Sequence, residues 1–385
     1  MTRGETTVRK VIEGGLGLAF FEGKTVFLPF AAPGDRVEFS VLKKSGNILF
    51  SRIEKVLEPS ELRIQPACPN FTRCPGCEFL HLSYQDELEI KAGMTAETFK
   101  RIGKTDIPTE KIILSPERFG YKNSAIFEFD GEGRPGLREE ESGEVISFPA
   151  DGCPLLSEKT AEAVQGLTGG SSRTGEPVLA RTDKFGATQF WGAEGVIEMP
   201  DILVESSGLL FPVKPRTPIR DNLYLNDIFV ETVASLPRRG TGSIIDLFCG
   251  VGTLSLAFSR KGMKVTGIDE QSGSIEDARA AANLNDMEEI SYLRGRIDRM
   301  LMKVEKPEAI NISSPAGGIS KQILKAVLKN NPAEIIINSA DAASMARDMG
   351  RLKENGYLPE KTFIVDLYPC RSSSQIVMLL RRAAH

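Results

Sequence analysis

The chain has 385 residues, of which 41% are apolar and 26% charged, and its formal net charge is −4. This length predicts two or three domains, and the composition is typical of a soluble protein. The slightly acidic balance excludes bulk electrostatic capture of nucleic acid, although a local basic groove remains compatible with it. The N-terminus lacks the apolar core of a signal peptide, and no uninterrupted apolar run approaches ~18 residues. We therefore expect a cytoplasmic protein that does not cross a membrane.

The N-terminal stretch, residues 1–58, alternates short β patterns with glycine turns. The expected strands cover residues 8–13, 16–21, 25–29, 36–43 and 47–56. Five short strands of this kind predict a small barrel, plausible as an OB-type barrel. Such a barrel serves either as a folding cap without a ligand or as an RNA-binding module. In the second case the phosphate contacts would come from Lys43, Lys44, Arg52 and Lys55.

Three cysteines with Pro and Gly between them follow the barrel, at positions 68, 74 and 77. Residues with this spacing cannot share one helix face, so they predict a loop able to surround a metal centre. A tetrahedral sulfur site needs a fourth ligand. Of Cys153, Cys249 and Cys370, we choose Cys153, because it lies in an Asp-Gly-Cys-Pro turn. An iron–sulfur cluster, a zinc ion and unligated thiols all remain open on spacing alone.

The central part of the chain begins with a helix that runs from about His81 to Arg101. The only other histidine is His385, which excludes a conventional Ser-His-Asp hydrolase and a histidine-rich metal site. Mixed β structure is then expected over residues 121–130, 144–148, 177–180, 187–191 and 202–205, with a polar loop over 166–176. Trp191 is either a core residue of its strand or a platform for a stacked base.

From Gly208 onward the pattern alternates strands with helices. Helices are expected over residues 222–236, 274–285, 320–329 and 345–355, and strands over 244–247, 264–268, 334–337, 363–368 and 375–381. This alternation predicts an α/β fold with a doubly wound sheet. In such a sheet the ligands bind at the carboxyl ends of the strands.

One β-α-β unit carries the features of a nucleotide site. Its first strand leads into Gly250-Val-Gly252, and its second strand ends at Asp269. Glycines let the backbone approach a nucleoside, and the carboxylate can accept both ribose hydroxyls. Ser255 stands where a dinucleotide fingerprint has its third glycine. A different nucleotide and a plain strand-to-helix turn remain alternatives.

The segment from Asp246 to Gly252, Asp-Leu-Phe-Cys-Gly-Val-Gly, resembles the first motif of class I S-adenosylmethionine (SAM) methyltransferases. In the same chain, Gly15-Leu-Gly17 and Pro33-Gly-Asp35 resemble a TRAM domain. The order of these parts, together with the cysteine loop, His81-Leu-x-Tyr84 and Tyr121-Lys-Asn123, resembles the iron–sulfur branch of the RNA (uracil-C5)-methyltransferases. That family makes 5-methyluridine in ribosomal or transfer RNA.

The resemblance implies a TRAM barrel over residues 1–58, a central domain over 59–207 and a Rossmann-like SAM domain over 208–385. It implies a [4Fe–4S] cluster on Cys68, Cys74, Cys77 and Cys153. It also implies that SAM is bound by Asp246, Phe248, Gly250, Gly252, Asp269 and Asn222. The expected partner is ribosomal or transfer RNA, and the expected state is a monomer.

The sequence departs from this family where the chemistry is done. A family cysteine adds to uracil C6, and a glutamate later removes the proton from C5. In this chain the cysteine position holds Ala340 and the glutamate position holds Gln375. A third family motif begins with an acidic residue, and this chain has Ser313 at that position. Of the family motif Phe-Phe-Gln-x-Asn, this chain keeps only the asparagine, Asn222. Register is fixed by Ala-Arg-Asp at 346–348, and no cysteine lies between residues 250 and 369.

These departures predict a catalytically degenerate member of the family that keeps RNA binding, the cluster and a SAM pocket. Two alternatives stay open: an active RNA methyltransferase whose chemistry needs no covalent adduct, and a non-enzymatic RNA-binding or assembly protein. Cys370, two residues after Tyr368, is the one thiol near the altered site that could replace the missing nucleophile. It would need a lowered pKa for that role.

Overall fold

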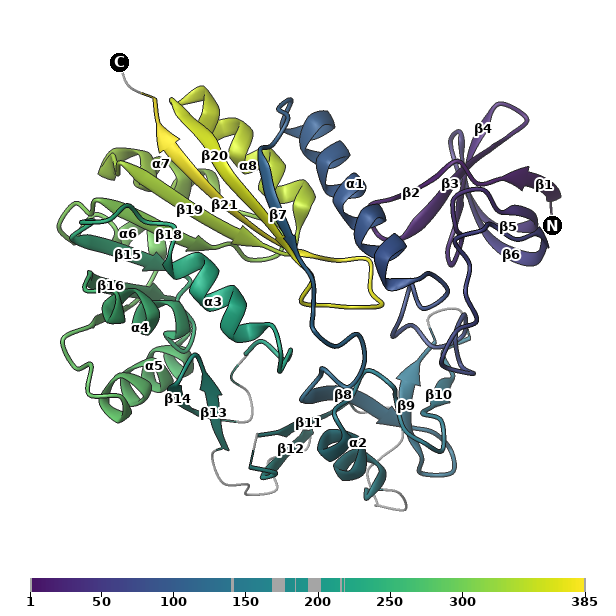
Figure 1. Cartoon of the computed structure of the whole chain (residues 1–385), viewed down its shortest axis with the longest axis horizontal. Coiled ribbons are helices and arrows are strands. Elements are labelled where there is room, and N and C mark those ends of the chain that lie inside the picture. The colour runs from purple at the N-terminus through teal and green to yellow at the C-terminus, as the bar shows by residue number, and fades with distance from the viewer. Residues whose placement is uncertain are drawn as a thin grey trace.

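The computed structural model describes residues 2–139, 142–167, 177–183, 185–192, 202–214, 217 and 219–383. The predicted polar loop over 166–176 falls almost wholly outside these residues. Three β-sheet regions follow one another along the chain, and Figure 1 shows the N-terminal and C-terminal ones on either side of helix α1 (Tyr84–Ile102). Helix α1 begins where the Ser83 hydroxyl accepts a hydrogen bond from the amide of Asp86.

The N-terminal region is a curled six-stranded sheet with the order β1-β5-β6-β4-β3-β2. Its strands are β1 (Arg3–Thr7), β2 (Lys10–Ile12), β3 (Leu16–Phe21), β4 (Lys24–Leu28), β5 (Arg36–Ser45) and β6 (Ile48–Glu58). Alternate residues of these strands, including Val26, Val37 and Phe39, form its core. The five predicted strands are confirmed, and β1 is an additional one that pairs with β5.

The central region contains a five-stranded sheet with the order β10-β9-β8-β11-β12. Its elements are β8 (Ser124–Phe129), β9 (Pro135–Arg138), β10 (Val145–Ser147), α2 (Glu158–Gln165), β11 (Val178–Thr182) and β12 (Thr188–Gly192). A separate hairpin of β13 (Ile202–Ser206) and β14 (Leu209–Val213) follows. The mixed β structure expected here is confirmed, whereas α2 was not predicted.

The C-terminal region is an eight-stranded sheet with the order β17-β16-β15-β18-β19-β21-β20-β7. Seven of its strands run in the same direction, whereas β21 runs antiparallel to both of its neighbours. The strands are β15 (Ser243–Leu247), β16 (Lys264–Asp269), β17 (Ser291–Arg294), β18 (Ala309–Ser313), β19 (Glu334–Ser339), β20 (Tyr357–Val365) and β21 (Gln375–Arg382). The helices are α3 (Asn226–Ala234), α4 (Thr253–Arg260), α5 (Ser272–Leu284), α6 (Ile297–Met300), α7 (Lys321–Asn330) and α8 (Ala342–Glu354).

Two apolar cores cover the two faces of this sheet, because successive strand residues point to opposite sides. Ile244 of β15 packs with α3, α4 and α5, whereas its neighbour Ile245 packs with α6, α7, α8 and α1. The predicted doubly wound α/β sheet is therefore confirmed. The carboxyl ends of its central parallel strands meet at one edge, where ligands of such sheets bind.

One edge strand of this sheet comes from the central part of the sequence. Strand β7 (Thr109–Ile113) pairs in parallel with β20, and α1 packs on α8. These two elements precede the range 208–385 in which the Rossmann-like domain was expected. The C-terminal sheet is thus completed by a segment that lies about 100 residues before that range.

Candidate functional site

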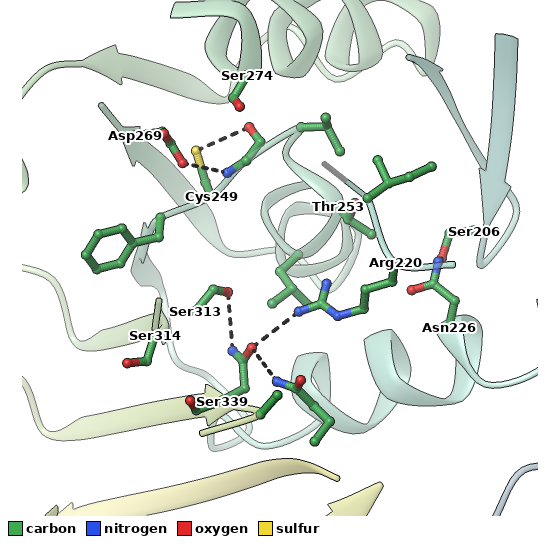
Figure 2. A pocket seen from close by; sticks show the side chains of 18 of the residues that line it. Ser206, Arg220, Asn226, Cys249, Thr253, Asp269, Ser274, Ser313, Ser314 and Ser339 are labelled. Atoms are coloured by element: carbon green, nitrogen blue, oxygen red, sulfur yellow. Dashed lines mark hydrogen bonds between the residues drawn. The ribbon is translucent and has the colours of Figure 1, made fainter. Parts of the chain in front are cut away.

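A cavity of about 550 Å³ opens at the carboxyl edge of the C-terminal sheet. Its volume lies in the range of small-ligand sites, about 300–1,000 Å³. Figure 2 shows the side chains that reach it from several elements. The lining includes residues that directly follow or end the parallel strands: Phe248, Cys249, Gly250, Asp269, Ser313, Ser314, Asn338, Ser339, Ala340 and Asp341.

The glycine turn forms one end of the cavity. Gly250 and Gly252 have φ angles of 55° and 82°, a conformation that side chains disfavour. A Cβ atom at Gly252 would collide with the Tyr292 ring, so glycine is needed there for packing. A Cβ atom at Gly250 would meet no heavy atom within 4 Å. Gly250 therefore keeps the backbone accessible from the cavity, as a nucleoside ligand requires.

Asp269 fixes this turn from the end of β16. One carboxylate oxygen accepts the amide of Gly250 at 3.0 Å, and the other accepts the amide of Gln271 at 2.9 Å. The side chain lines the cavity while the residue is only 8% exposed. Each carboxylate oxygen accepts more than one hydrogen bond, so both remain able to take a ligand hydroxyl.

Three residues expected to bind the cofactor, Asp246, Asn222 and Gly252, lie outside the cavity lining. Asp246 is fully buried and accepts hydrogen bonds from Ser255 Oγ at 2.6 Å and Asn311 Nδ2 at 2.7 Å. Burial raises the pKa of Asp246 to about 6. Ser255 stands at the third glycine position of the dinucleotide pattern. Its hydrogen bond to Asp246 therefore stabilises the turn from the protein interior.

Asn222 is another residue of this kind. Its amide nitrogen donates to the carbonyl of Leu367 at 2.9 Å, and its oxygen accepts the amides of Tyr224 and Leu225. It ties the start of α3 to the loop after β20. Gly252 also lies outside the lining, whereas Phe248, Gly250 and Asp269 lie within it.

The opposite end of the cavity contains Ala340, Gln375 and Ser313, the three altered motif positions. Asn338 connects the polar members of this group. Its Nδ2 donates to Ser313 Oγ at 3.3 Å, and its Oδ1 accepts Gln375 Nε2 at 3.4 Å (Figure 2). The Ala340 methyl group completes this part of the lining without a polar atom.

Arg220 adds a cation to this network. Its Nη2 donates to Asn338 Oδ1 at 3.4 Å, and its guanidinium lies 4.0 Å from the ring centroid of Phe229. Burial lowers the pKa of Arg220, although Tyr368 and Asp246 oppose this effect, and an arginine still remains protonated at neutral pH. Sequence reasoning missed Arg220 and Asn338, although their places beside two altered motifs were visible in the sequence.

Asp341 is the one carboxylate at this end of the cavity among the described residues. It caps helix α8 by accepting the amide and hydroxyl of Ser344, and it also accepts the amide of Gly317. Burial raises its pKa, but these hydrogen bonds outweigh burial and hold the pKa below the ordinary value. Asp341 is therefore a helix cap and a poor proton acceptor.

Comparisons with known proteins agree with this geometry. Residues 240–356 match a family described as a methyltransferase domain. Over its full length the chain resembles the crystal structure of a Pyrococcus abyssi tRNA (uracil-54, C5)-methyltransferase in complex with S-adenosyl-L-homocysteine. The TM-score is 0.77 at 19% identity, over 98% of this chain and 100% of that one. The chain has a methyltransferase fold.

Relatives in sequence carry a matching description. An uncharacterized RNA methyltransferase of Listeria monocytogenes is 24% identical over 98% of this chain and 97% of its own length. Another from Gloeobacter violaceus is 26% identical over 96% of this chain and 94% of its own. The likeness to these relatives therefore extends beyond the matched domain to the N-terminal and central regions.

A buried ionic network holds the loop that joins β20 to β21 in this methyltransferase fold. Lys91 of α1 donates to Glu87 and Asp366, both at 2.7 Å, and to the carbonyl of Tyr368 at 3.0 Å. All three ionic side chains are 1% exposed or less. Glu87 also accepts Arg118 Nη2 at 2.8 Å and the amide of Cys370 at 2.7 Å. The network thereby fixes the loop that leads to Gln375.

Two tyrosines of the sequence motifs hold segments near this network: Tyr121 contacts the same loop, and Tyr84 contacts the segment that follows β7. The Tyr121 hydroxyl donates to the carbonyl of Pro369 at 3.0 Å, and the Tyr84 hydroxyl accepts the amide of Ser115 at 2.7 Å. His81 is buried and stacks on Phe71, and burial lowers its pKa to about 4. These motif residues therefore stabilise the structure around the cavity.

Neither nearby cysteine is suited to act as a nucleophile. Cys370 is fully buried and does not line the cavity, and burial together with Glu87 raises its pKa to about 12. Cys249 lines the cavity, but burial and the carboxylates of Asp246 and Asp269 raise its pKa well above the ordinary value. Both thiols stay protonated at neutral pH, and the thiolate is the reactive form.

The four cysteines proposed as metal ligands are all free thiols. Cys68, Cys77 and Cys153 lie in one apolar cluster with Leu80 and Leu155. Burial raises the pKa of Cys74 to about 11, with smaller contributions from the charges of Cys153 and Cys68. In the part of the chain that the structure describes, no group of three or more His, Cys, Asp or Glu residues has the arrangement of a metal site. No helix among these residues is long and apolar enough to span a membrane.

Proposed function

We propose that this protein is a degenerate relative of the RNA (uracil-C5)-methyltransferases, which binds SAM and RNA but does not make 5-methyluridine. The observation that carries the proposal is the pair Ala340 and Gln375, which face the candidate cavity where that chemistry needs a thiol and a carboxylate. The methyltransferase fold and the relatives described as RNA methyltransferases support the general class.

SAM binding is supported by the glycine-turn end of the cavity. The open backbone at Gly250 allows a nucleoside to approach, and Asp269 can accept both ribose hydroxyls. Phe248 offers an apolar wall beside them. The matching solved structure contains S-adenosyl-L-homocysteine, the product that SAM leaves after methyl transfer.

The loss of 5-methyluridine chemistry follows from the groups at the other end. Uracil C5 becomes nucleophilic only after a thiolate adds to C6, and alanine cannot add to a pyrimidine. In another enzyme, removal of a covalent nucleophile cost about 10⁶ in rate, roughly 8 kcal/mol of barrier. Gln375 cannot take the C5 proton, and Asn338 already holds it as a donor. Cys249 and Cys370 do not replace the thiolate, because their pKa values are raised.

RNA binding is assigned to the N-terminal sheet. Lys43, Lys44, Arg52 and Lys55 are all exposed, and they lie on the paired strands β5 and β6. We propose that residues 1–58 form a TRAM-type RNA-binding barrel, followed by a central domain over 59–207 and a SAM domain over 208–385. The protein is proposed to act on ribosomal or transfer RNA as a cytoplasmic monomer.

We also propose that Cys68, Cys74, Cys77 and Cys153 hold a [4Fe–4S] cluster. Four half-buried free thiols support this set, although they do not have the arrangement of a metal site among the described residues. Burial, with smaller contributions from neighbouring thiols, raises the pKa values of Cys74 and Cys153, and a bound cation would remove that penalty. A Cβ atom at Gly76 would come within 3.4 Å of Cys74 Sγ, so glycine leaves room beside this sulfur. A cluster bound there would join the cysteine loop to the turn around Cys153.

Iron and acid-labile sulfide measured per chain test this cluster. Cys153→Ser is expected to lose most of the iron, whereas Cys249→Ser, which removes a thiol of the glycine turn, is expected to keep it. Equal iron content in the two variants contradicts the assignment, and zinc in place of iron identifies the other metal that fits four thiolates.

Calorimetry with SAM, combined with transfer of tritiated methyl groups from SAM to total RNA, separates the proposal from its alternatives. Binding without transfer agrees with the proposal. Transfer to a base nitrogen identifies an active methyltransferase with non-covalent chemistry. Absence of SAM binding identifies a non-enzymatic RNA-binding protein, and transfer to uracil C5 refutes the proposal.

A further inference from the structure

The central sheet forms a second cavity, of about 970 Å³, that is separate from the methyltransferase cavity. Its floor is one face of strands β8, β11 and β12, where Ile126, Leu179 and Trp191 lie in one cross-strand row. Ile126 is 64% exposed, so this row presents an open apolar platform. The next row along the same face contains Ser124, Arg181 and Gln189.

Arg181 is the unusual member of this cavity. The residue is 5% exposed, yet its Nε and Nη1 atoms have no hydrogen-bond partner among the described residues. Burial lowers its pKa to about 10, opposed by the charge of Asp221, so the side chain is still charged at neutral pH. Burying a cation costs several kcal/mol unless its donors are satisfied, and two donors of Arg181 have no partner among the described residues. The cavity therefore offers an unsatisfied cation to a ligand.

The other ionic groups of this cavity do not satisfy Arg181. Asp221, the only carboxylate among the lining residues that the structure describes, pairs with Lys122 at 3.1 Å. Arg371 also lines the cavity and lies 3.5 Å from Glu78 outside it. The lining thus holds three cations and one carboxylate, and this excess of positive charge selects an anion.

The position of this cavity indicates where its ligand comes from. Ile219 lines both cavities. Of the two residues that follow it, Arg220 lines the methyltransferase cavity and Asp221 lines the second one. A ligand in the second cavity would therefore lie beside the group that enters the first. Consecutive nucleotides of one RNA strand satisfy this arrangement, because each carries a phosphate and a base with an apolar face.

We propose that the Arg181 cavity binds a single unpaired nucleotide of RNA, neighbouring the one presented to the methyltransferase cavity. The base lies on the platform of Ile126, Leu179 and Trp191, and the phosphate pairs with Arg181. This inference rests on the RNA-binding part of the proposed function and adds the place at which a single-stranded segment is held. It does not depend on whether any methyl group is transferred.

Trp191 is the only tryptophan of the chain, so its fluorescence reports directly on this platform. A single-stranded RNA of about ten nucleotides is expected to quench the emission of the full-length protein, since bases stack on aromatic rings. Adenosine 5′-monophosphate is expected to quench it at higher concentration. Adenosine, which lacks the phosphate, is expected to bind more weakly than the monophosphate.

Arg181→Met is the decisive variant. We expect it to weaken RNA binding about 10- to 100-fold, the usual effect of losing one hydrogen-bonded ion pair. Arg181→Lys is expected to restore part of the affinity. Arg239→Met removes an exposed cation on the connection before β15 and serves as the control, with an expected change of less than about twofold.

Thermal unfolding separates a ligand-binding role from a structural one. Removal of a buried guanidinium whose Nε and Nη1 have no partner among the described residues should not lower the melting temperature. A marked decrease would assign Arg181 a structural role and overturn the inference. RNA binding that leaves Trp191 emission and the Arg181→Met affinity unchanged also overturns it, while the proposed function stands. If RNA does not bind, the RNA part of the proposed function fails. Monophosphate quenching then supports the cavity as a nucleotide site, and its absence refutes it.

Discussion

The two ends of the methyltransferase cavity differ in how their residues are tied to the fold. At the glycine-turn end, Gly252 packs under Tyr292, and Asp246 is bonded to Ser255 and Asn311 inside the core. At the other end, Ala340 and Gln375 contact the cavity and only a loose amide network. The residues of the first end contribute to the stability of the fold as well as to the ligand site. Their intact motif therefore does not by itself establish catalysis. We expect substitutions at the second end to cost less stability than substitutions at the first.

The largest effect should come from restoring the nucleophile. In the presence of SAM and RNA that contains 5-fluorouridine, Ala340→Cys is expected to form a covalent adduct, because the fluorine at C5 prevents the final elimination. The wild-type protein and the matched variant Ala340→Ser should form none, since a hydroxyl lacks the reactivity of a thiolate. Denaturing electrophoresis measures the adduct. An adduct of the wild-type protein would show that another residue acts as nucleophile and would remove the contrast between the two ends.

The support of the altered end is tested at Lys91. Lys91→Met leaves Glu87 and Asp366 buried without their cation, and this should lower the free energy of unfolding by about 3–5 kcal/mol. Lys10→Met is the matched control, because Lys10 also pairs with a glutamate of α1 but is 44% exposed. Its cost should stay below about 1 kcal/mol. Chemical denaturation measures both, and equal costs would show that burial of the network contributes little.

Asp246 should make the stability of the folded protein depend on pH. Burial raises its pKa from 3.8 to about 6, so the folded protein holds this proton more tightly than the unfolded chain. The stability that results is present below pH ~4 and is lost as the pH rises through ~6, by about 3 kcal/mol in all. Asp246→Asn should remove this decline. Urea unfolding of both proteins between these pH values checks it, and an unchanged pH dependence in the variant would contradict the assignment.

The smallest expected effect concerns ligand binding at the same end. Asp269→Ala should weaken SAM binding about 10- to 100-fold, because two charge-assisted hydrogen bonds to the ribose are lost. Asp298→Ala removes a half-buried carboxylate that is paired with Arg296 and lies outside the cavity lining, and it should leave the affinity unchanged. Calorimetry measures both. If Asp269→Ala binds SAM as tightly as the wild-type protein, the ligand does not use this carboxylate.

Much of the fold was predictable because it depends on local pattern. The glycine turn, the carboxylate after β16 and the alternation of strands and helices are each written within a short segment. The partner of β7 was not predictable, since a short half-polar strand pairs with β20, which lies far along the chain. The pairing of Lys91 with Asp366 spans 275 positions, and a lysine within a helix ordinarily predicts an exposed face.

The sequence predicted which residues belong to the candidate site, but it did not predict which contacts they make. Sequence motifs identified Ala340, Gln375 and Asp269 as members of one site, and the structure brings them to one cavity. They also placed Asn222 and Asp246 at the cofactor, although both are committed to hydrogen bonds within the protein. The burial of Cys370 and the lack of partners for Arg181 Nε and Nη1 among the described residues depend on packing between distant elements, which a single sequence does not encode locally.

Nucleoside mass spectrometry tests the central claim most directly. Wild-type protein and the double variant Ala340→Cys, Gln375→Glu are each incubated with unmodified ribosomal and transfer RNA and with SAM that carries a deuterated methyl group. The account predicts no deuterated 5-methyluridine from the wild-type protein, with any product confined to the double variant. Deuterated 5-methyluridine formed by the wild-type protein would contradict it.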